Sequence, residues 1–109
     1  MDPMEFLLRL QAQWAEVLGE VNRYYCSKAA RRDVRDRETL WRYFVKSGGA
    51  EDFAERWAEA MGDQNRWFCS EFYVQEINDP RVLWAYYMAK HDGDEPPPLG
   101  ACGRAFCRI

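Results

Sequence analysis

Histidine is nearly absent from this sequence, which contains His91 and no other. A di-iron bundle requires two Glu-x-x-His pairs and a zincin site requires two histidines, so a single histidine excludes both classes of site. The sequence also lacks a Gly-x-x-x-x-Gly-Lys-Ser phosphate loop, and its Ser47-Gly48-Gly49 segment is better explained as the end of a helix. No motif specifies a reaction, and we expect a non-enzymatic protein without catalytic residues.

Long apolar runs are missing as well. No stretch of about 18 uncharged apolar residues occurs, which argues against a membrane span. The N-terminal segment has Glu5 and Arg9 among its apolar residues, and it lacks the basic region and uninterrupted apolar core of a secretory signal. We therefore expect an intracellular protein of the cytoplasm or the nucleus.

Aromatic residues, in contrast, are abundant. The 109 residues include 5 Trp, 6 Tyr and 6 Phe, which make up 16% of the chain. Rings bury a large area per residue, which suits the small core of a single short domain. Such a core has no room for every ring, so we expect several at the surface, where Tyr and Trp are typical anchors of protein interfaces.

The net charge of −3 argues against general nucleic-acid affinity, but the charges are unevenly distributed. Residues 28–46 carry seven cations and three anions, whereas the rest of the chain is acidic. The arginines of this segment recur at helical spacing near aromatic residues, which makes nucleic-acid contact an alternative. Pairing at i,i+4, such as Asp33 with Arg37 and Glu38 with Arg42, explains the pattern more simply.

Apolar periodicity predicts an all-α protein. One long helix is expected over about residues 3–29, because a stripe spaced alternately three and four residues apart runs through it: Leu7, Leu10, Trp14, Val17, Val21 and Tyr24. Four further helices are expected, over residues 33–46 or 36–46, 50–61, 64–77 and 80–91, with boundaries at Gly48-Gly49, Gly62 and Asn78-Asp79-Pro80. We therefore expect a compact, irregular bundle of about five helices over residues 1–92.

Two features of this bundle have more than one interpretation. The stripe of the first helix suits burial within the bundle, but its a/d spacing is also typical of a coiled coil, so a homodimer through this helix is an alternative. Residues 93–109 are rich in Gly and Pro, and we interpret them as a C-terminal tail that is packed on, or pinned to, the bundle.

The four cysteines allow several kinds of chemistry. His91, Cys102 and Cys107, with Cys69 or Cys26 as a fourth, offer ligands of the types that zinc prefers, but their spacing lacks a Cys-x2-Cys knuckle. An even count also permits two disulfides. The simplest interpretation places Cys26 and Cys69 as buried thiols in helices. We expect no cofactor, with zinc as the alternative, and a cysteine enzyme that uses Cys69 and His91 as a further one.

The functional hypothesis is a protein-interaction module. The candidate partner-binding residues are charges and rings expected on helix surfaces: Arg42, Tyr43, Glu51, Glu55, Glu59, Arg66, Trp67 and Tyr86. We expect the module to inhibit or recruit another, larger protein, as phage or viral proteins do when they disable a host defence. The alternative is a small zinc-stabilised or nucleic-acid-associated regulator that uses His91 and the tail cysteines. Neither a membrane nor nucleic acid is the expected partner.

Overall fold

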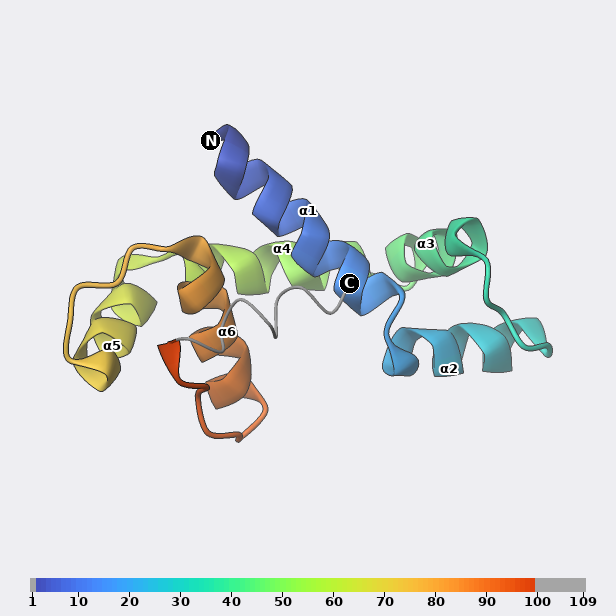
Figure 1. Ribbon diagram of the computed structural model, residues 1–109. Helices are drawn as coiled ribbons and strands as arrows, with labels where there is room; N and C mark the ends of the chain where they lie inside the picture. The colour runs from blue at the N-terminus through green and yellow to red at the C-terminus, as the bar shows by residue number, and fades with distance from the viewer. Residues whose placement is uncertain (1, 100–109) are drawn as a thin grey trace.

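The computed structural model describes residues 2–99, and most of them are helical (Figure 1). The helices are α1 (Pro3–Val17), α2 (Glu20–Ala30), α3 (Arg37–Lys46), α4 (Gly49–Ala60), α5 (Asp63–Tyr73) and α6 (Pro80–His91). The described residues contain no strand, which confirms the all-α prediction with six helices in place of about five. None of these helices is long and apolar enough to cross a membrane.

The single long helix predicted over residues 3–29 is wrong, because the structure divides it into α1 and α2. Helix α1 ends at Val17, and Gly19 adopts an extended backbone (φ −74°, ψ 164°) at the start of α2. The side chain of Asn22 holds this turn, since its Nδ2 donates to the carbonyl oxygens of Val17 at 2.8 Å and Leu40 at 3.3 Å. One amide thus satisfies an orphan carbonyl of α1 and ties α1 to α3.

The same turn occurs a second time, between α4 and α5. Gly62 has φ −76° and ψ 165°, and Asn65 Nδ2 donates to the carbonyl oxygens of Ala60 at 2.8 Å and Leu83 at 3.3 Å. Each of these residues follows its counterpart in the first turn by 43 positions. The two turns therefore match in sequence, backbone and hydrogen bonding.

This correspondence extends over the helices on both sides, so the described chain consists of two tandem three-helix units. Unit 1 comprises α1–α3 and unit 2 comprises α4–α6; α5 begins and ends 43 residues after α2. Twelve of the 31 residues at positions 14–44 recur unchanged 43 positions later, as the pairs Trp14/Trp57, Ala15/Ala58, Glu16/Glu59, Gly19/Gly62, Asn22/Asn65, Arg23/Arg66, Cys26/Cys69, Ser27/Ser70, Asp36/Asp79, Leu40/Leu83, Trp41/Trp84 and Tyr43/Tyr86.

The loop between the second and third helix also repeats. The backbone N–H of Val34 donates to the Ser27 hydroxyl at 3.0 Å, and the equivalent bond in unit 2 has the same length. The second helix of each unit ends in a left-handed residue, Arg31 (φ 56°) or Val74 (φ 55°), although neither is glycine. An aspartate then caps the third helix in both units.

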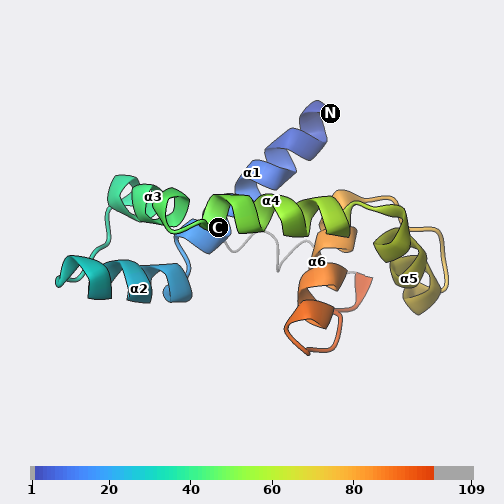
Figure 2. The same ribbon diagram turned by 180° about the vertical axis from the view of Figure 1, so that it is seen from behind.

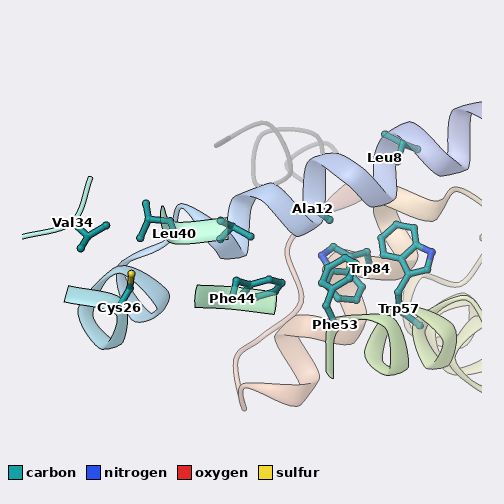
Figure 3. Close-up of a cluster of buried hydrophobic side chains, with 11 residues drawn as sticks. Leu8, Ala12, Cys26, Val34, Leu40, Phe44, Phe53, Trp57 and Trp84 are labelled. Atoms are coloured by element: carbon teal, nitrogen blue, oxygen red, sulfur yellow. The ribbon is translucent and has the colours of Figure 1, made fainter. Parts of the chain in front are cut away.

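A pair of indoles recurs in each unit, partly buried against the core in unit 1 and buried within it in unit 2. Trp14 stacks on Trp41 with ring centroids 4.9 Å apart, and Trp57 lies against Trp84 at 5.1 Å. Figure 3 shows the second pair beside Phe53, beneath α1, in a buried cluster that contains residues of both units. A smaller buried cluster (Cys69, Ile77, Leu83 and Tyr86) belongs to unit 2 alone.

The two units are arranged along the long axis of a molecule that measures 48 × 28 × 20 Å. Helix α4 runs across the middle, with α2 and α5 toward opposite ends (Figures 1 and 2). A largely buried ion pair joins the units: Arg56 Nη2 lies 2.6 Å from Glu16 Oε1. Burial alone would lower the pKa of Arg56, but its hydrogen bonds to Glu16 and Asp52 raise it, so the cation is retained.

The tail predicted at residues 93–109 is described as far as Leu99. Pro96 is buried, and the Tyr73 hydroxyl donates to the carbonyl oxygen of Pro97. The first part of the tail therefore packs against unit 2. Cys102 and Cys107 lie outside the described residues.

Replacing either bridging asparagine should destabilise the fold. We expect Asn22→Ala and Asn65→Ala each to lower the free energy of unfolding by about 1–3 kcal/mol, because two carbonyl groups lose their donor. Urea denaturation followed by circular dichroism measures the change. Asn78→Ala is the control, since its exposed amide makes only a 3.4 Å contact with Glu76, and it should change stability by less than about 0.5 kcal/mol. Equal effects of all three variants would contradict this assignment.

Replacing Val74 with glycine should stabilise the fold. A β-branched residue in the left-handed region costs about 1–2 kcal/mol, and the side chain is 89% exposed, so little packing is lost. We expect Val74→Gly to raise the free energy of unfolding by about 0.5–1 kcal/mol. Val21→Gly is the matched control, because Val21 is 72% exposed but lies within α2; this variant should be destabilised.

Candidate partner-binding surface

Two pairs of exposed rings lie at equivalent positions of the two units. Tyr24 and Tyr25 on α2 meet edge to face with centroids 5.2 Å apart, and Trp67 and Phe68 on α5 do so at 5.1 Å. Their exposed fractions are 61% and 52% in the first pair, and 59% and 47% in the second. The two pairs match in position, mutual geometry and exposure.

Helical geometry explains why these rings face outward. Asn22 and Cys26 are four residues apart on α2 and therefore share one face, which the bridging amide and the buried thiol fix toward the interior. Tyr24 lies two residues from each of them and therefore projects from the opposite side of the helix, whereas Tyr25, three residues after Asn22, lies at its flank. Because unit 2 carries the same Asn-x-x-x-Cys spacing, it presents its own rings in the same way.

The charges around the two ring pairs differ. Beside Tyr24 a shallow hollow is lined by three cations and two anions: Arg23, Lys28, Arg32, Glu20 and Asp33. Arg23 recurs as Arg66 beside Trp67. On α5 the positions equivalent to Lys28 and Arg32 are Glu71 and Gln75. Residues 6–48 contain nine cations and five anions, whereas residues 49–91 contain four cations and eight anions. The two 43-residue repeats, residues 6–48 and 49–91, thus share a ring pattern but carry net charges of +4 and −4.

The predicted acidic row lies on α4, on the face that is equivalent to the face of α1 packed against unit 2. Glu51, Glu55 and Glu59 are all exposed. The residues 43 positions earlier are Leu8, Ala12 and Glu16, and Leu8 and Ala12 are buried where α1 meets unit 2. The row therefore occupies the face on which a further unit would stack. A polar outer face of this kind closes the end of a repeat stack.

The Glu59 carboxylate also accepts a hydrogen bond from the Tyr87 hydroxyl. Burial and this hydrogen bond raise the pKa of Tyr87 to about 12, so the phenol stays neutral and remains a donor at neutral pH. The hydrogen bond to Tyr87 therefore fixes the Glu59 side chain against α6 of its own unit.

The remaining predicted residues have different surroundings. Trp67 is exposed, as predicted, and belongs to a ring pair. Arg66 is half-buried, with Nη1 3.1 Å from Asp63 and Nη2 donating to the Met61 carbonyl. Tyr43 is half-buried against the core. Tyr86 is only 6% exposed because it packs in the small cluster of unit 2, so its prediction as a surface residue was wrong.

The basic segment makes ion pairs of the predicted kind, although not with all the predicted partners. Arg42 is exposed and pairs with Glu38 one turn earlier, as expected. Asp33 binds Arg35 at 2.7 Å and Arg23 at 3.3 Å instead of Arg37, because it lies in the loop before α3. Much of the positive charge is therefore compensated locally.

The described part of the chain does not assemble the alternative zinc site. No group of three or more His, Cys, Asp or Glu residues lies close enough to hold a metal there. Cys69 is fully buried in α5, whereas His91 is exposed at the end of α6, 3.5 Å from Asp92. The other two proposed ligands, Cys102 and Cys107, lie outside the described residues.

The apolar periodicity did not indicate most of the ring surface. Tyr24 belongs to the predicted stripe of the first helix, Tyr25 was expected at a surface only in the alternative of nucleic-acid stacking, and Phe68 was not predicted to contact a partner. The signal that could have found them was the 43-residue repeat, because ring pairs that follow an Asn-Arg in both copies mark equivalent surfaces.

The two buried cysteines should resist thiol reagents in the native state. Cys26 and Cys69 are 2% and 0% exposed, and burial raises the pKa of the Cys26 thiol, which lowers the thiolate fraction. In a Cys102→Ser/Cys107→Ser background, we expect labelling at least about 100-fold slower than in denaturant. An added Ser47→Cys exposed thiol is the control, and native labelling of Cys26 or Cys69 at its rate would contradict the assignment.

Comparison with protein-family models, with curated proteins and with solved structures finds no match for this chain. Its function must therefore be inferred from its own residues. The features available are the tandem units, the paired rings and the contrasting charges of the two ends.

Proposed function

We propose that this chain is a non-enzymatic protein-interaction module that binds a larger protein through the exposed ring pairs of α2 and α5. The observation that supports this is the recurrence of two adjacent, half-exposed rings at the same position of both units. Core packing does not require large rings there, whereas Tyr and Trp are enriched among the residues that anchor protein interfaces.

The positions of the ring pairs suit a partner that contacts both ends of the molecule. Helices α2 and α5 lie toward opposite ends (Figure 1), so each ring pair can meet a different part of the partner. The basic surroundings of the first pair favour an acidic patch, and the acidic surroundings of the second favour a basic one. A module with two linked sites acts as an inhibitor when it covers a functional surface, or as an adaptor when it holds two surfaces together.

Affinity capture with matched variants tests the role of the rings. The wild-type chain, a Tyr24→Ala/Tyr25→Ala variant and a Trp67→Ala/Phe68→Ala variant are immobilised at equal density. Bound proteins are then compared by quantitative mass spectrometry. We expect a partner retained by the wild type to be lost at least about tenfold from each variant, because a ring anchor contributes about 2 kcal/mol or more.

The control removes an exposed apolar side chain outside the ring pairs. Val74→Ala loses a valine that is 89% exposed and should retain the partner fully. Circular dichroism of each variant checks that the helices are intact. Retention of the same proteins by both ring variants would refute the proposal. Recovery of nucleic acid in place of protein, through the basic α2 pair alone, would support the alternative regulator.

A further inference from the structure

The N-terminal half of α1 carries an apolar face that nothing in the described chain covers. Phe6, Leu7 and Leu10 on α1 are 54%, 53% and 37% exposed, and Figure 1 shows α1 projecting away from the other helices. We call these three residues the unit 1 end face. This face is separate from the ring pairs, and an inference about it does not depend on the proposed function.

The repeat shows that this kind of face is covered elsewhere in the same molecule. Phe53 on α4 is equivalent to Leu10 and is 0% exposed, because α1 and α3 of unit 1 lie against α4. Gly49, the equivalent of Phe6, lies so close to the Phe44 ring that a Cβ would be 2.7 Å away. Unit 2 thus uses this face to stack on unit 1, whereas unit 1 has no unit before it among the described residues.

We propose that the unit 1 end face is a self-association interface on which a second copy of the chain docks by its own unit 1 end face. The symmetric arrangement places leucine and phenylalanine against the same residues of the partner, which removes apolar surface from water on both sides. Assembly stops at two copies, because each copy uses its one end face to bind the other.

The opposite end of the molecule disfavours the head-to-tail alternative. A second copy stacked as a third unit would place Phe6 and Leu10 against the exposed row of Glu51, Glu55 and Glu59. Burying carboxylates against apolar side chains costs free energy without compensating hydrogen bonds. Head-to-tail stacking would also leave an open end and build filaments. The desolvation of this acidic row and closure therefore both favour pairing of the two apolar ends, against the mutual repulsion of two units that each carry a net positive charge.

Only part of the apolar stripe seen in the sequence can serve this interface. Leu7 and Leu10 remain available, but Val17 is fully buried and Trp14 stacks on Trp41. Val21 and Tyr24 belong to α2, beyond the break at Gly19. The interface is accordingly a short contact between projecting helix ends, which predicts a reversible dimer rather than a long coiled coil.

Sedimentation equilibrium over about 1–500 μM tests the proposal. We expect the mass to rise from 12.9 kDa to twice that value and no further. Leu7→Gln/Leu10→Gln should weaken the dimer roughly 10,000-fold, since both copies lose two leucines and each of the four leucines withdrawn from the interface costs about tenfold in affinity. Glu51→Lys/Glu55→Lys, which alters the opposite end, should leave the dimer unchanged. Raising the salt concentration should not weaken it, because two like-charged units meet.

Three results would overturn the proposal: a wild-type chain that stays at 12.9 kDa throughout, a mass that grows beyond two copies, or a dimer lost in Glu51→Lys/Glu55→Lys but not in the leucine variant. The last two would indicate head-to-tail stacking. A second variant guards against misfolding of the leucine variant. Leu7→Cys in a Cys102→Ser/Cys107→Ser background should form a disulfide-linked dimer under mild oxidation. Gln64→Cys on exposed α5 is the control and should not cross-link.

Discussion

The hydrogen bonds of one asparagine side chain underlie the organisation of each unit. Asn22 and Asn65 each hold the end of a first helix against a third helix, across a turn at a glycine. Because the amide reaches two carbonyl groups on different helices, it fixes three helices with one side chain. The packing of the indoles and the outward direction of the ring pairs both follow from that turn.

Unit 1 packs on unit 2 through a face of α1, and the equivalent face of α4 carries different residues. Leu8 and Ala12 let α1 lie against unit 2, and Arg56 reaches across to Glu16. At the far end, the corresponding face of α4 carries Glu51 and Glu55 instead. The two units therefore share the same three-helix arrangement but differ in the residues of this face. This asymmetry makes one end of the molecule polar and the other apolar.

Local signals in the sequence predicted much of the fold. They failed at Gly19, where a helix ends although the apolar spacing continues. The boundaries at Gly48, Gly62 and Asp79-Pro80 were found because capping residues or glycine there interrupt the apolar pattern. At Gly19 the apolar spacing of three and four continues across the break, so the pattern predicted one continuous helix over residues 3–29. Asn22 stabilises the break between α1 and α2, and its partner Leu40 lies too far along the chain for periodicity to connect the two residues.

The sequence by itself determined the all-α class, most helix ends and, through its 43-residue repeat, the existence of two equivalent units. These follow from interactions between residues close in the chain. Only the tertiary structure decided which rings are covered: Tyr86 is buried while Trp67 is exposed, although both lie on apolar helices. Exposure depends on which helix packs against which, and that depends on contacts such as Asn65 with Leu83 that join distant parts of the chain.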